Sequence, residues 1–179
     1  ILTHIPLLHT WSLSIEEQFY LIYPVFLLTA LKFGKNNIKL ILVIFIFLSF
    51  FFSILINKNH GSFNFYMLTS RGWELLLGAL LAVIEKKRNY ELGNNFKTIL
   101  SFLGTCLIII SFLFFDNVNN HPGYKTLLPV VGTSLIIFCS HPKNFIDKVL
   151  SFNFLKNIGL ISYSLYLWHH PIFSFAKIL

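Results

Sequence analysis

The chain alternates between long apolar runs and short polar connections. A membrane-spanning helix needs about 20 mostly apolar residues. About six segments approach that length: residues 11–31, 38–56, 65–84, 98–115, 126–140 and 158–179. The fifth is short and contains Pro129 and Gly132, and residues 145–154 fit an interfacial stretch better than a span. The pattern therefore predicts an all-α fold, a polytopic transmembrane helix bundle of about six spans, with residues 1–179 as one domain.

The composition favours a bilayer over water as the solvent of this chain. Hydrophobic residues make up 55% of the sequence and charged residues only 12%. A soluble domain typically carries about 25% charged residues. The two cysteines, Cys106 and Cys139, both lie within apolar runs, so a disulfide framework is not expected.

The basic residues are concentrated in alternate connections between the apolar runs. The first, third and fifth connections hold ten Lys and Arg residues, and the second and fourth hold three. The positive-inside rule places the richer set in the cytoplasm, so Ile1 and Leu179 are both expected outside. This distribution also accounts for the formal charge of +7 without a nucleic-acid partner.

Polar residues at 9–24 form the first candidate cluster for a functional site. Glu16 and Glu17 open the first predicted span, and Glu16, Tyr20 and Tyr23 share one helical stripe. One interpretation is a capping box, in which Ser14 and Glu17 cap the helix start. The other is a functional site, because a carboxylate inside a membrane is costly.

The second cluster lies at residues 69–82. Arg71 and Glu74 are three residues apart and can pair on one helix face. Gly78, one turn further, would let another helix approach closely. The alternatives are an interfacial Arg71 that reaches toward water beside a neutralised Glu74, or a charged pair in the bundle interior.

The third cluster lies at residues 159–172, near the end of the last predicted span. Ser162, Tyr166 and His169 form one stripe, and Tyr163, Tyr166 and His170 form an adjoining one. Pro171 cannot donate a hydrogen bond to the Leu167 carbonyl, which predicts a kink and a free acceptor. The alternatives are a functional polar face and an aromatic belt at the outer interface.

The predicted topology places all three clusters in the outer half of the membrane. A shared cavity that opens outward is therefore expected. The sequence contains no P-loop, GxGxxG, GxSxG or metal-ligand spacing, and no metal site is predicted. Four other histidines fall in or near connections and are expected to be solvated: His9, His60, His121 and His141.

Three segments carry a resemblance to a known family: HTWSLSIEEQFY from His9, RGWELLLG from Arg71 and SYSLYLWHHP from Ser162. In this order they resemble the acyltransferase-3 family of integral membrane O-acyltransferases. The resemblance implies a bacterial, multi-pass enzyme of the inner (plasma) membrane. Such an enzyme would transfer an acyl group, often acetyl, from acyl-CoA to a hydroxyl of a cell-surface polysaccharide or glycan precursor. Lipopolysaccharide, exopolysaccharide and peptidoglycan are typical acceptors.

The resemblance also suggests where the site residues lie. The family's presumed catalytic histidine is expected upstream of Ile1, so the catalytic residue itself is unknown here. Glu16 and Glu17 are the catalytic candidates within the chain. The substrate-binding candidates are Trp11, Ser12, Tyr20, Arg71, Glu74, Tyr166, His169 and His170.

Further expectations concern the extent of the chain and its partners. The chain is expected to be a fragment that lacks the N-terminal helices and the final helix, and to be inactive alone. No bound cofactor is expected; acyl-CoA is the donor substrate, and the lipid bilayer and a glycan acceptor are the other partners. A non-enzymatic transporter or flippase for a glycan lipid is the alternative, although it does not account for the order of the three segments.

Overall fold

The computed structural model describes residues 10–34, 37–57, 67–86, 93–114, 124–141 and 144–178. These residues form helices and short connections and contain no β-strand, which confirms the all-α prediction for this part of the chain. The helices are, in order, α1 (Trp11–Lys32), α2 (Ile38–Asn57), α4 (Leu68–Lys86), α5 (Asn94–Phe114), η4 (Tyr124–Thr126), α6 (Leu127–Phe138), α7 (Phe145–Leu150) and α8 (Asn153–Ile178).

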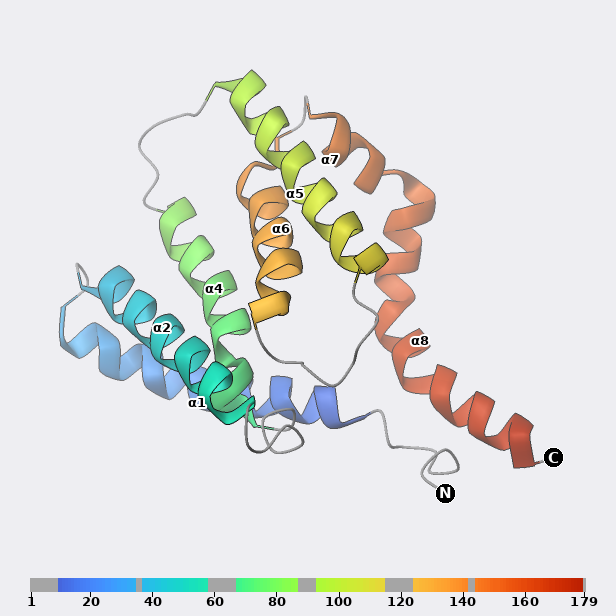
Figure 1. Cartoon of the computed structure of the whole chain (residues 1–179), viewed down its shortest axis with the longest axis horizontal. Helices are drawn as coiled ribbons and strands as arrows, with labels where there is room; N and C mark the ends of the chain where they lie inside the picture. Colours follow the sequence, from blue (N-terminus) through green and yellow to red (C-terminus); the bar gives the residue numbers. More distant parts are fainter. Residues whose placement is uncertain are drawn as a thin grey trace.

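Each of the six predicted spans coincides with a helix, and most boundaries agree within a few residues. The predicted interfacial stretch contains the short helix α7. The predicted start of the third span, residues 65–66, lies outside the described residues. In Figure 1, α2, α5 and α8 run downward and α4 and α6 run upward, as expected for a chain that reverses direction at each connection.

Two of these helices are both long enough and apolar enough to cross a membrane, one over Ile38–Ile56 and the other over Asn94–Phe114. Charged and polar residues lower the mean hydropathy of α1, α4 and α8. Helix α6 and the preceding 3₁₀ turn cover Tyr124–Phe138, which is shorter than a full span.

The first half of the chain is organised around the contact between α2 and α4. Ile38 and Leu42 of α2 pack against Leu76 of α4 and form the buried core of this group. Ile38 and Leu42 are four residues apart on α2, so they share one helix face. Helix α1 covers the same core with apolar side chains that recur every three or four residues: Phe19, Tyr23, Phe26, Leu27 and Leu31.

The second half of the chain is organised around α5 and α6, whose backbones touch at two glycines. A Cβ atom placed on Gly104 would lie 2.6 Å from the Gly132 carbonyl oxygen, and one placed on Gly132 would lie 2.7 Å from the Gly104 carbonyl oxygen. The expectation that Gly78 serves this purpose is wrong for the described residues, since a Cβ atom there would meet nothing within 4 Å. Gly78 lies on an exposed part of α4 instead.

Helix α8 lies at the edge of the structure, on the side opposite α2 (Figure 1). Residues 153–165 are all exposed, and burial begins only in its last turns, at Pro171 and Ser174. Cys106 of α5 and Cys139 after α6 are both free, which agrees with the sequence analysis.

Candidate functional site

Arg71 and Glu74 form an ion pair in the first turns of α4. Arg71 Nη2 lies 3.4 Å from Glu74 Oε2, and the two side chains are 25% and 19% exposed. The predicted pairing is therefore confirmed. The second carboxylate oxygen, Oε1, is buried and has no hydrogen-bond partner. A buried acceptor of this kind is costly unless something satisfies it.

Trp73 adds a second unpaired polar atom beside Glu74 in the sequence. Its side chain is only 2% exposed, and its ring packs edge-on against Phe50 of α2, with 5.1 Å between ring centroids. The indole Nε1 is buried without a hydrogen-bond partner. Successive residues of α4 thus carry an unpaired donor and an unpaired acceptor. The sequence pattern did not single out Trp73, although this residue lies between the predicted partners Arg71 and Glu74.

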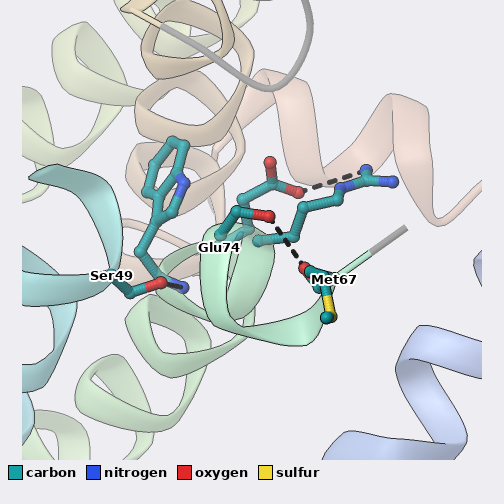
Figure 2. Close-up of polar contacts among 6 residues, drawn as sticks. Ser49, Met67 and Glu74 are labelled. Carbon is teal, nitrogen blue, oxygen red and sulfur yellow. Dashed lines mark hydrogen bonds and ion pairs between the residues drawn. The ribbon is translucent and has the colours of Figure 1, made fainter. Parts of the chain in front are cut away.

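Ser49 of α2 contacts the backbone of this same turn. Its hydroxyl donates to the Thr69 carbonyl oxygen at 2.7 Å and accepts from the Trp73 N–H at 3.0 Å. Figure 2 shows Ser49 reaching α4 from the neighbouring helix, and the Arg71–Glu74 ion pair on α4 as a dashed line. Sequence reasoning missed Ser49 because it is one hydroxyl within an apolar run.

The third cluster lies on α8, where the structure fixes the orientation of His169. Its Nδ1 lies 2.6 Å from the Tyr166 carbonyl oxygen and 3.2 Å from that of Leu165. Carbonyl oxygens only accept, so Nδ1 carries the proton, and in the neutral ring Nε2 holds the lone pair. His169 also lines a groove of about 380 Å³ together with Ile161, Ser164, Leu165, Trp168 and Ile172.

Other members of the third cluster lie around His169. The Tyr166 and His169 rings are 5.6 Å apart, and His170 Nδ1 lies 3.3 Å from the Ser174 hydroxyl. Pro171 lies inside α8, which continues to Ile178. The Leu167 carbonyl therefore lacks the backbone donor that residue 171 would normally supply.

The first cluster is less enclosed. Glu16, Glu17 and Tyr20 are exposed within the described part of the chain, and no resolved contact joins them to Glu74. Tyr23 instead stacks on Phe19, with 4.9 Å between ring centroids, so the predicted polar stripe divides between surface and core. Trp11 begins α1 and Ser12 follows it, but their side chains lie outside the described residues.

The capping-box interpretation of the first cluster is wrong. Helix α1 begins at Trp11, so Ser14 lies inside the helix and cannot cap it. The Ser14 hydroxyl accepts a hydrogen bond from Gln18 Nε2 at 3.4 Å instead. The two adjacent glutamates are therefore not explained as capping residues.

A larger groove of about 560 Å³ lies between α1, α2 and α4. Its walls are almost wholly apolar, and they include Phe19, Tyr23, Phe45, Phe52 and Leu76. Neither this groove nor the one on α8 joins residues of all three clusters. In Figure 1 the start of α1, the start of α4 and the end of α8 all lie in the lower half of the view, which agrees with a common height.

Comparison with known proteins connects this chain to a family. The acyltransferase-domain family, acyltransferase-3, matches the chain over residues 1–179. The chain belongs to this family. No solved structure matches it significantly.

Relatives of this acyltransferase-3 chain carry names that specify a reaction. The peptidoglycan O-acetyltransferase OatA of Listeria monocytogenes is 35% identical over 181 residues, which cover 94% of this chain and 29% of OatA. YrhL of Bacillus subtilis, named provisionally as a peptidoglycan O-acetyltransferase, is 31% identical and covers 93% of this chain and 28% of its own length. A protein of Staphylococcus aureus strain COL, named provisionally as an O-acetyltransferase, is 34% identical, covering 96% and 30%. The chain thus spans less than a third of the length of these relatives.

One further polar cluster of the acyltransferase-3 chain lies just after α6, around His141. His141 was expected to be solvated, but both of its ring nitrogens are buried without a hydrogen-bond partner. The cause is the compact turn around it: Asp147 accepts the His141 backbone N–H, and Asn144 caps α7 while donating to Ser101 of α5 at 2.7 Å. The other histidines of the connections, His9, His60 and His121, lie outside the described residues. Among the described residues, no group of three or more His, Cys, Asp or Glu could hold a metal ion.

Proposed function

We propose that this chain is part of a membrane-embedded O-acyltransferase that transfers an acetyl or other acyl group from acyl-CoA to a hydroxyl of a cell-surface polysaccharide. Peptidoglycan is the first acceptor to test, because two relatives are named for it. The observation that carries the proposal is the family match over residues 1–179. Family membership also favours this reaction over transport or flipping of a glycan lipid.

The second part of the proposal is a multi-pass location in the plasma membrane of a bacterium. The crossings would be made by α1, α2, α4, α5, α6 with its preceding turn, and α8. Three observations support this arrangement: the apolar length of α2 and α5, the alternating helix directions, and the concentration of basic residues in alternate connections. In this orientation α4 begins, and α8 ends, near the outer face.

The reaction requires a base and a site that orients two substrates. The acceptor hydroxyl oxygen would form a bond to the thioester carbonyl carbon, the C–S bond would break, and the hydroxyl proton would pass to a base. Coenzyme A would then leave as the thiol after protonation. The base is proposed to be a histidine, as the family resemblance implies. Within the chain, Glu16 and Glu17 are proposed to orient the base or the sugar.

The residues on α4 and α8 are proposed to bind the acceptor. The unpaired Glu74 oxygen can accept a hydrogen bond from a sugar hydroxyl, and Arg71 pairs with the other carboxylate oxygen. His169 lines the groove on α8, with Tyr166 and His170 beside it. Trp11, Ser12 and Tyr20 complete the proposed substrate-binding set.

The proposal is tested in a bacterium that lacks its own peptidoglycan O-acetyltransferase. The protein that contains this chain is expressed there, and acetate released from purified peptidoglycan by mild base is measured. Glu74→Gln should lower the released acetate roughly a hundredfold, to a rate that can still be measured, without lowering the amount of protein in the membrane. Glu85→Gln is the matched control, since Glu85 lies on the same helix at an exposed position.

A second measurement tests the donor. Membranes that contain the protein are supplied with acetyl-CoA labelled in the acetyl group, and label in the glycan is counted. The absence of label in the glycan from active membranes would refute acyl-CoA as the donor. Full acetate release by Glu74→Gln would remove Glu74 from the site.

A further inference from the structure

Ser49 stands out because a side chain of α2 takes part in the backbone hydrogen bonding of α4. An α-helix pairs each N–H with the carbonyl four residues earlier, so Trp73 N–H and Thr69 C=O are natural partners. The Ser49 hydroxyl lies within hydrogen-bond distance of both, at 3.0 and 2.7 Å. The contact falls in the turn that carries Arg71 and leads into Glu74 (Figure 2).

The next residue of α2 holds the same part of α4 by a different contact. The Phe50 ring packs edge-on against the Trp73 indole, with an interplanar angle of 74°. Gly72 lies opposite Ser49, and a Cβ atom there would lie 3.6 Å from the hydroxyl oxygen, an ordinary contact distance. Helix α2 therefore holds Trp73 both at its backbone and at its ring.

Trp73, which α2 holds in this way, carries the unpaired Nε1, and the next residue along α4 carries the unpaired Glu74 Oε1. We propose that Ser49 is a positioning residue for the acceptor site, through which α2 fixes the direction of the Trp73 indole N–H and the Glu74 carboxylate. This inference rests on the proposed function and adds Trp73 to the residues that bind the acceptor.

The chemistry of a sugar hydroxyl fits this pair of atoms. A sugar hydroxyl can donate a hydrogen bond to Glu74 Oε1, and a sugar hydroxyl can accept one from Trp73 Nε1–H. Such a site works only if both groups are held in place before the substrate binds. A serine hydroxyl within an apolar helix is itself costly unless it is bonded, and here its partners are the backbone groups that set the geometry.

A double-mutant cycle in the full protein tests the proposal. Ser49→Ala should lower kcat for acetyl transfer roughly tenfold, because it removes hydrogen bonds that orient the site. The KM for acetyl-CoA should not change, and Ser49→Thr, which retains the hydroxyl, should recover most of the rate. Ser134→Ala is the matched control, since the Ser134 hydroxyl bonds only to a carbonyl of its own helix among the resolved contacts.

The deciding measurement combines Ser49→Ala with Glu74→Gln in one protein. If Ser49 acts through the α4 site, the double variant should be no slower than Glu74→Gln alone, whereas two unrelated defects would multiply. Multiplying effects, or a normal rate for Ser49→Ala, would overturn the inference. Should Ser49→Ala fail to reach the membrane, Phe50→Leu removes the ring contact instead, and the same non-additivity with Glu74→Gln is expected.

The two proposals fail in different ways. A fully active Glu74→Gln variant contradicts the proposed acceptor site itself. A strongly impaired Glu74→Gln variant together with a fully active Ser49→Ala variant contradicts only the role of Ser49. Trp73→Phe keeps the ring but removes Nε1, and it should lower kcat/KM for the acceptor while leaving the donor KM unchanged.

Discussion

Gly104 of α5 and Gly132 of α6 face each other so closely that each would place a Cβ atom against the carbonyl oxygen of the other, at 2.6 and 2.7 Å. No side chain fits between the two backbones at this point. In a membrane, where apolar burial gives little drive for helices to associate, such close backbone packing is a principal source of stability. The pair therefore fixes the spacing of α5 and α6.

Gly104→Ala should destabilise the protein by about 1–3 kcal/mol, because the added methyl group forces the two helices apart. Gly78→Ala is the matched control, since a Cβ atom there meets nothing within 4 Å. The control should be neutral or slightly stabilising, because alanine favours a helix over glycine. Thermal unfolding of the purified protein in detergent measures both. Equal stability of the two variants would contradict the structure at this contact.

The Arg71–Glu74 pair predicts a different pattern of stability. Arg71→Ala leaves the Glu74 carboxylate without its ionic partner in a largely buried position, which should cost about 3 kcal/mol. Replacing both residues together, as Arg71→Met with Glu74→Leu, should cost much less, because no uncompensated charge is left. The same unfolding assay compares the single and double variants. A double variant that is less stable than Arg71→Ala would show that the pair itself is a net source of stability.

The roles of the two ring nitrogens of His169 can be tested separately by substitution. His169→Asn keeps a donor near the Nδ1 position for the Tyr166 carbonyl but lacks Nε2. We expect it to fold normally and to lower kcat/KM for the acceptor roughly tenfold or more. Acetate release per amount of membrane protein is the measurement. Unchanged transfer by His169→Asn would mean that His169 serves only the structure of α8.

The proposed crossings predict which positions are accessible from each side of the membrane. With Cys106 and Cys139 replaced by serine, single cysteines at Met67 and Tyr124 should react with an impermeant maleimide in intact cells. Cysteines at Phe33 and Ser140 should react only after the membrane is opened, because their connections hold the excess of Lys and Arg. All four wild-type residues are exposed in the structure. Labelling of Phe33→Cys from outside would reverse the topology and move the candidate site to the cytoplasmic face.

Much of the helical architecture can be predicted from the apolar pattern. Helix α2 was expected at residues 38–56 and is observed at Ile38–Asn57, because a run of apolar residues bounded by polar ones determines both ends. The Arg71–Glu74 pair is equally local, since residues three apart on a helix are neighbours. Features that depend on a single helix turn can therefore be predicted from the sequence.

Contacts between helices are not encoded so locally. Ser49 reaches Trp73 across 24 residues, and nothing within α2 indicates that this one hydroxyl faces α4. The close glycine contact was assigned to Gly78, but helix packing places it at Gly104 and Gly132. The capping box failed for a related reason, because α1 starts one turn before Ser14. The residues that line each groove likewise depend on contacts between helices and could not be predicted from the sequence.

The proline inside α8 has a consequence for solvation. Pro171 leaves the Leu167 carbonyl without its backbone donor in the same helix turn as His169 and His170. An unbonded carbonyl group is costly in hydrocarbon, so the Leu167 carbonyl oxygen must accept a hydrogen bond from a neighbouring side chain or from water. In the proposed crossing, the last turns of α8 must therefore bring a polar group, from the protein or from water, to the level of His169 and His170.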